Sequence, residues 1–356
     1  MLPSDSWISP RLCVLINGQA LVGAVQAEVT SNNHYGADHF SAVAAIGPDS
    51  WADVSFWAAQ QDIAVDIQFS VDGGANFVSL LQGAVDNVVV DPVTGLVHLD
   101  GRDLTAQLIE TRTQETFANR TASEIATLLA GRHNLSARVA PTSTPVGRYY
   151  QSEHDRITLD QFCRATTEWD LLVFLARQEG FDVFVQGAAL YFQPSSQQEG
   201  SVVQLCPTDL TELRLERSLT LARDIEVAVK SWNSRLGSVF VQRARASGSS
   251  AGNTSTVQNY AYVRPNLTPD AALKLAQQKL TELTRHERIV ELGMAGELTL
   301  TPRSMIMLQG TGSDFDQLYY VDVIVRRLHY QGGFTQHIRA RNTSPRTITM
   351  PSAQAM

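Results

Sequence analysis

The sequence predicts a mainly β protein with an α/β insert in the middle of the chain. Short runs of alternating apolar and polar residues, separated by turn signals, extend from Leu12 to Leu99 and predict antiparallel strands. The same pattern returns in the last third of the chain, whereas the region between carries helix signals. We therefore expect three modules and a tail, at residues 1–103, 104–200, 201–343 and 344–356.

Composition narrows the class of protein. The chain has 356 residues, 44% of them hydrophobic, which is enough for two or three packed modules. A net charge of -8, without a long run of Lys or Arg, argues against strong binding to phosphate backbones. The three cysteines, Cys13, Cys163 and Cys206, lie far apart without CxxC spacing, which argues against a zinc site and against a disulfide framework. This pattern indicates a chain made in a reducing cytoplasm. No export signal and no membrane span are expected.

One segment of the first β-rich region has the alternation expected of a strand with one buried face. In IAVDIQFS, the residues Ile63, Val65, Ile67 and Phe69 alternate with polar residues and predict one face packed against a core. Turn signals follow in VDGG and DPVTG, so several strands succeed one another at short spacing. This spacing is typical of a barrel or a sandwich.

The stretch GLVHLDGRDLTAQLIE passes from strand to helix and carries two acids around a glycine. Asp100 and Asp103 could hold a metal or share acid/base chemistry, and the turn could cradle a phosphate. A phosphate loop needs several glycines at fixed offsets, however, and this segment has one interior glycine and no lysine. The favoured interpretation is structural: Gly101 turns the chain, Asp103 or Thr105 caps a helix, and Arg102 is solvated.

The insert contains sequence signals that mark where its helices begin and end. Each of two segments combines a capping box with an apolar stripe and a terminal glycine. The expected boxes are Thr121 with Glu124 and Thr158 with Gln161, and the expected stops are Gly131 and Gly180. A pair of strands, FDVFVQGAALYFQP, should complete this module.

The second β-rich region contains a long hairpin, DIEVAVKSWNSRLGSVFVQRARA. Ile225, Val227 and Val229 should face one side of its first strand. The opposite face of that strand is polar. That face carries Asp224, Glu226 and Lys230, and the later arginines are Arg243 and Arg245.

A single helix and a terminal hairpin close the chain. Thr268 should cap a helix at about residues 268–287, with Pro269 in its first position. In YYVDVIVRRLHYQGGFTQHIRA, the valines Val321, Val323 and Val325 are expected to face the strand interior. A nucleic-acid surface is the alternative for the basic and aromatic residues, but a strand pair with a charged outer face is favoured. That face would include Arg326, Arg327, His329 and Arg339.

No catalytic, cofactor-binding or metal-binding residues are predicted. His34 and His39 lack an HExxH motif or a neighbouring carboxylate set, and no GxSxG elbow occurs. His154 is expected in a solvated turn and Cys163 as a buried thiol on a helix. Two carboxylates that converge from distant positions, as in a glycosidase, stay possible on sequence alone.

The order of these segments resembles the late control D family of baseplate or tail hub proteins of tailed phages. The segments are GRDLTAQLIETR, FANRTASEI, EWDLLVFLARQEGFDVFVQGAALYFQP and YYVDVIVRRLHYQGGFTQHIRARN. The same core is similar to the tube part of type VI secretion spike proteins. The resemblance covers roughly residues 5–343 and rests on the order of the segments more than on any one of them.

This resemblance implies two tail-tube-like β-barrels separated by a helical α/β module, in a homotrimer. Six barrels per ring would match the hexameric tail tube on one side, while threefold symmetry would meet a spike or central fibre protein on the other. Other baseplate components would be neighbours, DNA would pass transiently, and the protein would be located in the virion after synthesis in the host bacterial cytoplasm. DGRD would be the joint between the first barrel and the insert.

In a tube built from such barrels, the polar face of the hairpin would be the candidate for the channel wall. Its cations, Lys230, Arg243 and Arg245, would then be paired to acids or turned toward neighbouring subunits, because unpaired cations would retard DNA. The alternative is that the hairpin faces outward and its charges form an ordinary solvated surface.

Two alternatives to the phage hub stay open. The same architecture would serve as the hub of a phage-derived injection or secretion device. A tail-tip cell-wall hydrolase is the enzymatic alternative, although the chain departs from longer relatives by showing neither a long β-helical spike nor a recognisable lysozyme segment after the second barrel.

Overall fold

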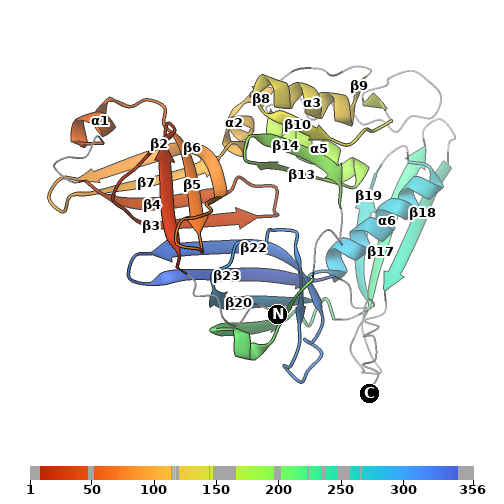
Figure 1. Ribbon diagram of the computed structural model, residues 1–356. Helices are drawn as coiled ribbons and strands as arrows, with labels where there is room; N and C mark the ends of the chain where they lie inside the picture. The colour runs from red at the N-terminus through yellow and green to blue at the C-terminus, as the bar shows by residue number, and fades with distance from the viewer. Residues whose placement is uncertain are drawn as a thin grey trace.

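The computed structural model describes residues 9–46, 52–113, 115, 117, 120–143, 145–146, 166–195, 202–222, 224–233, 238–246, 257–264 and 267–343. Within this part of the chain, the protein is mainly β with a few helices. Figure 1 shows a wide sheet, a helical module above it and a separate small sheet with one helix at the side. The expected fold class is therefore confirmed at this level.

The wide sheet has thirteen strands and draws on both β-rich regions. Its strands follow one another in space as β16 (Glu212–Arg217), β20 (Arg288–Ala295), β23 (Gly333–Asn342), β22 (Leu318–His329), β3 (Ala24–Asn32), β4 (His39–Ala45), β7 (Leu96–Asp103), β6 (Val78–Asp91), β5 (Ala64–Ser70), β1 (Arg11–Ile16) and β2 (Gln19–Ala20). Beside this path, β21 (Met305–Leu308) pairs with β22, and β15 (Val203–Leu205) pairs with β21. Two short helices attach to it, α1 (Val54–Ala59) and the 3-10 helix η1 (Pro207–Asp209).

Pairing of β22 with β3 joins the two β-rich regions. The two strands are antiparallel, from Val323 opposite Asn32 to His329 opposite Gln26. Among the described residues, the pairing path ends at β16 on one side and at β2 on the other, so the sheet is not a closed barrel. The strand pairing therefore does not give the expected two barrels. Alternation identifies the buried face of a strand, but it does not say which distant strand covers a free edge.

Two apolar clusters cover the inner face of the wide sheet. The first cluster includes Ile67 and Phe69, and the second includes Ile306, Tyr319 and Ile338. The predicted alternation in β5 is confirmed, because the exposed fractions of Ile63, Val65, Ile67 and Phe69 are 6% or less. The second cluster lies wholly in the second β-rich region, whereas the first also takes in Leu328 and Phe334 from β22 and β23, so the first core spans the joint between the two regions.

A β-bulge changes the predicted faces of the terminal hairpin. The register shifts between Val321 and Val323, which reverses the alternation along β22. Val321 is buried as expected, whereas Val323 and Val325 are half-buried on the other side. Arg326, expected on the charged outer face, points inward instead and donates from Nε to the carbonyl oxygen of Glu297 at 2.9 Å. The sequence pattern could not show the bulge, because both registers alternate equally well.

The insert packs helices against a small sheet. Its described helices are α2 (Thr105–Glu110), α3 (Ala122–Arg132) and α5 (Glu168–Glu179). The sheet has the order β10 (Ser136–Val139), β14 (Ala189–Pro194) and β13 (Phe181–Gln186). Short pairs join β8 (Arg112–Thr113) to β12 (Thr166–Thr167) and β9 (Arg120–Thr121) to β11 (Pro145–Val146).

The helix boundaries of the insert largely follow their sequence signals. The Thr121 side chain accepts the N–H of Glu124 at 3.2 Å, and the Glu124 carboxylate accepts the N–H of Thr121 at 2.8 Å, which confirms the first capping box. Gly180 ends α5 with a φ of 72°, as predicted, while α3 runs one residue past Gly131. The second expected box, Thr158 with Gln161, lies outside the described residues. A box that the sequence reading missed, Thr167 with Asp170, begins α5.

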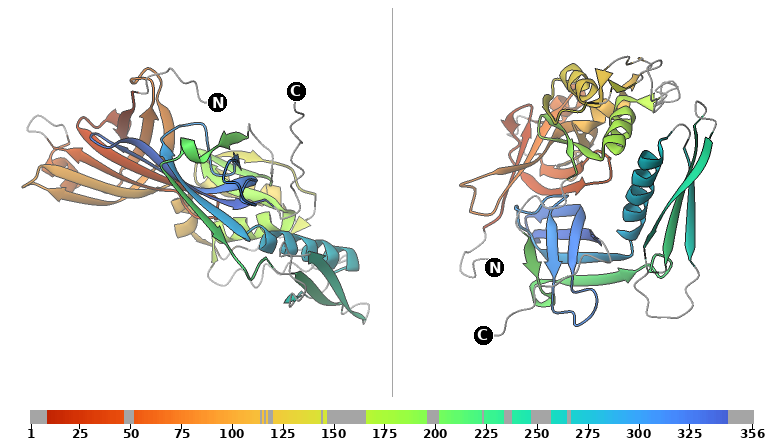
Figure 2. Two further views of the ribbon diagram at one scale, coloured as in Figure 1. Left: turned by 90° about the horizontal axis from the view of Figure 1, so that it is seen from below. Right: turned by 90° about the vertical axis from the view of Figure 1, so that its right-hand side faces the viewer.

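A separate unit, here called the arm, consists of β17 (Ile225–Asn233), β18 (Ser238–Ala246), β19 (Gln258–Val263) and α6 (Pro269–Thr284). Figure 2 shows it at the margin of the molecule, beside the wide sheet. Ile225, Val227 and Val229 are buried against Ala272 and Ala276 of α6, which confirms the predicted alternation. Thr268 caps α6 and Pro269 occupies its first turn, also as predicted. The hairpin is thus not a part of the wide sheet.

The DGRD segment is strand rather than turn. Gly101 lies inside β7, where a Cβ atom would be 2.1 Å from the carbonyl oxygen of Ala84 and 2.6 Å from the ring of Phe40. Only glycine fits at this position, because the backbone at Ala84 and the ring of Phe40 both lie so close to it. The predicted turn at Gly101 is therefore wrong. The capping prediction for Asp103 holds in part, since its carboxylate accepts the N–H of Thr105 at 3.2 Å as α2 begins.

Gly101→Ala is expected to lower the free energy of unfolding by about 1–3 kcal/mol, the usual cost of forcing extra volume into a packed site. Urea unfolding followed by circular dichroism measures this change. Gly131→Ala is the matched control, because a Cβ atom there meets no atom within 4 Å and Gly131 lies in α3. Equal stability of the two variants would contradict the packing argument.

Candidate functional site

A continuous polar surface lies on the outer side of the wide sheet. We call it the polar face: the outward side chains of β16, β20, β23, β22, β3, β4, β7 and β6, opposite the two cores. The strand register sets these side chains in rows across the sheet. One such row runs Arg327, Glu28, Ser41 and Asp100.

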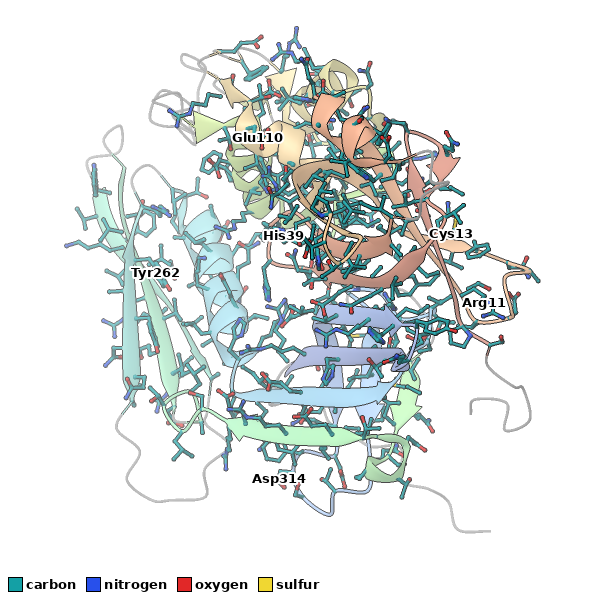
Figure 3. All side chains as sticks on the ribbon, turned by 90° about the vertical axis from the view of Figure 1, so that its left-hand side faces the viewer. Arg11, Cys13, His39, Glu110, Tyr262 and Asp314 are labelled. Atoms are coloured by element: carbon teal, nitrogen blue, oxygen red, sulfur yellow. The ribbon has the colours of Figure 1, made fainter. Side chains whose placement is uncertain are left out.

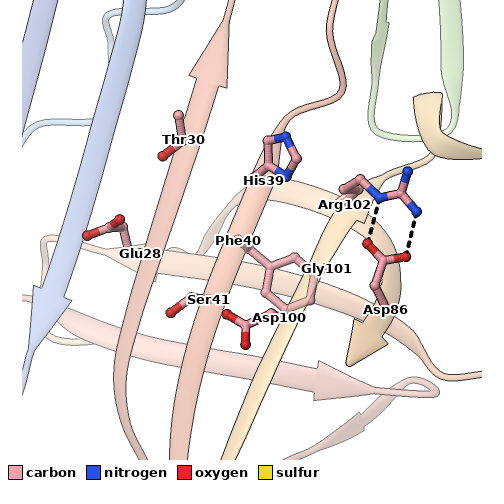
Figure 4. Close-up of a pocket in the computed structure, with 9 residues that line it drawn as sticks. All are labelled: Glu28, Thr30, His39, Phe40, Ser41, Asp86, Asp100, Gly101 and Arg102. Atoms are coloured by element: carbon pink, nitrogen blue, oxygen red, sulfur yellow. Dashed lines mark hydrogen bonds and ion pairs between the residues drawn. The ribbon is translucent and has the colours of Figure 1, made fainter. Parts of the chain in front are cut away.

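A hollow of about 390 Å³ opens on this face over β3, β4, β7 and β6. Figure 4 shows its lining, in which Phe40 lies across Gly101 at the floor while the polar side chains stand around it. The lining residues are Glu28, Thr30, His39, Phe40, Ser41, Asp86, Asp100, Gly101 and Arg102. Its ionisable lining residues are three acids, Glu28, Asp86 and Asp100, together with Arg102 and His39.

Arg102 is held by two carboxylates at the edge of this hollow. Its Nε and Nη2 donate to the two carboxylate oxygens of Asp86 at 2.6 and 2.8 Å, and Nη2 also donates to Glu110. The hydrogen bonds from Arg102 keep the pKa of Asp86 below its usual value. The expectation that Arg102 is simply solvated is therefore wrong, because β6 and α2 bring two acids to it.

The other arginines of the polar face are paired in the same way. Arg327 donates from Nε to Glu28 at 2.7 Å, across the joint between β22 and β3. On the neighbouring strands, Glu291 accepts Arg214 at 3.3 Å and lies 3.7 Å from Arg339. These are cross-strand contacts between partly exposed side chains, so each contributes about 0–1 kcal/mol to stability.

The acids and bases considered in the sequence do not gather into a catalytic group. Within the described ranges, no three His, Cys, Asp or Glu side chains are placed to hold a metal ion. His39 lies on the polar face and His34 in the preceding loop, while Asp100 is exposed and Asp103 is buried. Figure 3 places His39 and Glu110 on the body of the molecule, apart from Tyr262 on the arm. His154 and Cys163 lie outside the described residues.

The three candidate channel-facing residues belong to the arm. Asp224 pairs with Arg245 at 2.7 Å and Glu226 with Arg243 at 2.8 Å, so the expected pairing of these arginines is confirmed. Lys230 is exposed on the same face as Glu226. Whether this face meets a channel stays a prediction, because the hairpin lies outside the wide sheet.

A buried polar junction, which sequence reasoning missed, lies where the wide sheet meets the insert. Asp38 precedes β4, Asp103 ends β7, and Arg303 reaches them from the loop before β21. The guanidinium carbon of Arg303 lies 3.6 Å from the ring centroid of Phe184 in β13, and its Nη1 donates to Asn33 at 3.2 Å. The signal available in the sequence was weak, because these residues come from four separate segments.

Burial controls the electrostatics of this junction. It raises the pKa of Asp38 to about 6. Burial, followed by the charge of Asp38, raises the pKa of Asp103 to about 8. Burial also lowers the pKa of Arg303. Two acids that share a low-dielectric site disfavour simultaneous ionisation, so Asp103 is neutral at pH 7.

The opposite end of the wide sheet carries exposed apolar turn tips, here called the rim: Val22, Val93 and Tyr330. Their exposed fractions of 75%, 95% and 84% are the highest among the large apolar residues of the described chain. Hydrogen bonds place the three turns at one end, because the N–H of Tyr330 donates to Val25, that of Ala45 to Gly23 and that of Ile46 to Gly95. Two of the tips are fixed by side chains, since Asp91 accepts the N–H of Val93 at 2.8 Å and His329 accepts that of Gln331 at 3.0 Å.

Solved structures share this architecture over nearly the whole chain. The 43 kDa tail protein of prophage MuSo2 from Shewanella oneidensis superimposes with a TM-score of 0.71 at 16% identity, covering 94% of this chain and 99% of that one. The chain has the fold of phage tail proteins. A tail protein of Neisseria meningitidis MC58 gives a TM-score of 0.68 at 13% identity, with 94% and 97% covered. The resemblance read from the sequence is thereby confirmed at the level of fold.

A secretion component shares the fold as well. The Escherichia coli c3393 protein, described as a component of the type VI secretion system, gives a TM-score of 0.56 at 12% identity, covering 93% of this chain and 77% of that one. Neither a protein-family model nor a curated protein matches the sequence. In the described part of the chain, no helix has the length and apolar character needed to cross a membrane.

Asp103→Asn is expected to flatten the dependence of stability on pH. The folded pKa of about 8 lies above the value of roughly 3.9 for an unfolded aspartate. The folded chain therefore keeps a proton that the unfolded chain has lost, and stability falls by up to about 1.4 kcal/mol per pH unit as pH rises from about 4 to 8. Asparagine removes this contribution, which leaves the smaller one that Asp38 makes between about pH 4 and 6.

Urea unfolding at several pH values between 5 and 9 measures the effect. Asp100→Asn, a change of the exposed aspartate three residues earlier on the same strand, serves as the control and should keep the slope of the natural chain. A natural chain whose stability does not fall over this range would contradict the buried, neutral state of Asp103.

Proposed function

We propose that this chain is the subunit of a phage tail hub. Three copies would form a ring that joins the hexameric tail tube to a threefold spike or central fibre protein, within the baseplate of the virion. The observation that supports this most is the likeness to a prophage tail protein over 94% of the chain. Synthesis in the host cytoplasm, a place among other baseplate components and transient passage of DNA belong to the same proposal.

The symmetry argument rests on the two β-rich regions. Each region supplies most of one apolar core, and the joint between β22 and β3 sets the two regions side by side in one sheet. Three chains would therefore present six such regions around an axis, which suits a sixfold tube on one side. A threefold partner would meet the chain once per subunit on the other side.

The polar face is the better candidate for the channel wall. It extends over eight neighbouring strands, and its arginines are paired with acids. The alternative wall, Asp224, Glu226 and Lys230 on the arm, is narrower and belongs to a separate three-stranded sheet. In both cases, a wall without free cations would let DNA pass without holding it.

The chain is proposed to have no enzymatic role. Arg102, Asp103 and Glu124 are accounted for by pairing or capping at their own positions. The likeness to a type VI secretion component favours one alternative, the hub of a phage-derived injection or secretion device. A cell-wall hydrolase has no comparable support, and a zymogram on cell walls with purified protein would test for one.

The first test of the hub is the mass of the assembled protein. Native mass spectrometry of the concentrated chain, or of the complex released from particles, should give three times 39.0 kDa. A reconstruction of the assembled particle should then show threefold symmetry at this protein. A monomer in the assembled state would overturn the proposal.

The rim is expected to contact the adjoining ring of the tail. Uncharged, fixed tips such as Val93 and Tyr330 lose little conformational freedom on docking, which favours them as anchors of an interface. The double variant Val93→Ala with Tyr330→Ala should therefore lower incorporation of the chain into particles by roughly tenfold or more.

Quantitative immunoblotting of purified particles measures the incorporation. Leu219→Ala is the matched control, because Leu219 is 72% exposed but lies between β16 and β17, away from the rim. Normal incorporation of the rim variant would exclude the rim as a contact, while the trimer mass would still test the hub itself.

A further inference from the structure

The arginines of the polar face share one property: each lies within ion-pairing distance of a carboxylate. Arg102 is paired with Asp86, Arg327 with Glu28, and Glu291 lies between Arg214 and Arg339. Arg341, at the margin of the face, has its Nε 3.3 Å from Asp322. The described strands of this face contain no lysine, so these arginines are its permanent cations.

Acids are in excess on the same surface. Glu216 of β16 and Asp100 of β7 are exposed on the polar face, in addition to the carboxylates that hold arginines. Glu212 lies 3.8 Å from His337 and adds a further acid at the β16 end. The face therefore carries positive side chains at regular intervals but no surplus of positive charge.

Stability does not account for this pattern. The side chains of Arg327 and Arg339 are 58% and 50% exposed, and ion pairs in such positions contribute little to folding. Binding to a polyanion depends on cations that are free to replace the counterions of phosphate groups. An arginine already held by a carboxylate must first give up that contact, and the carboxylate then repels the phosphate.

We infer that Glu28, Asp86 and Glu291 are masks, which keep the arginines of the polar face from holding a polyanion. The partner that fits this surface is duplex DNA that moves past it. The excess acids repel its phosphates weakly, and the paired arginines do not retain it. This inference rests on the proposed function, because it assigns DNA to a face that would line the channel. It differs from a generally acidic wall, since removing a few acids should convert the face into a binding surface.

The decisive variant is Glu28→Gln with Glu291→Gln. Both changes keep the size of the side chain and unmask Arg327, Arg214 and Arg339 without adding a cation. The affinity for a fluorescent 30-base-pair duplex, measured by anisotropy at low salt, should rise by at least about tenfold over the natural chain. The gain should disappear as salt increases, with a steeper salt dependence than that of the natural chain.

Asp62→Asn with Asp270→Asn is the matched control. It changes the net charge by the same amount, but Asp62 precedes β5 and Asp270 lies in the first turn of α6, both away from the polar face. This control should bind DNA as weakly as the natural chain does. Thermal unfolding of all three proteins confirms that they are folded.

Two results would overturn the masking. One is a folded Glu28→Gln, Glu291→Gln variant that binds no tighter than the control, and the other is a natural chain that already binds the duplex at the same low-salt condition. Both concern the free protein, so they are independent of whether it forms a hub.

Particles carrying the double variant test the link to the channel. DNA ejection from them should be slower than from particles with the control variant, because unmasked arginines would hold the passing duplex. Tight binding in solution with ejection at the normal rate would exclude this face as the DNA path. A trimer of the expected mass would then still support the hub.

Discussion

The pairing of β22 with β3 is the contact on which the rest of the structure depends. It joins segments nearly 300 residues apart and turns two β-rich regions into one sheet. The ladder covers an edge of each region that would otherwise be open to wrong pairing. It also aligns their outer faces, so that Arg327 meets Glu28 and the polar face becomes continuous.

The two ends of the wide sheet differ in burial: one is a buried polar junction and the other an exposed apolar rim. At one end, the insert closes over the buried junction of Asp38, Asp103 and Arg303, where low dielectric keeps one acid neutral at pH 7. At the other end, the turns carry exposed Val93 and Tyr330, held in place by side-chain hydrogen bonds. The junction end thus holds the insert against the wide sheet. The rim end leaves its apolar side chains exposed.

Local signals predicted the local structure well. Thr121 with Glu124, Thr268 with Pro269, and Gly180 begin or end helices because their chemistry satisfies backbone groups within a few residues. The buried faces of β5 and β17 followed from alternation for the same reason. The exceptions have identifiable causes: a bulge reversed the faces after Val321, and Gly101 serves a close approach instead of a turn.

The sequence by itself therefore determined the class of the fold and the acidic, largely lysine-free character of the chain. Only the tertiary structure decided that the two β-rich regions share a sheet, that the 225–246 hairpin lies on an arm, and that the arginines of the polar face are paired. The physical reason is that caps and alternation act within one element. Strand partners, ion pairs such as Arg339 with Glu291, and the burial that raises the pKa of Asp103 depend on contacts between elements, and no local pattern encodes which elements meet.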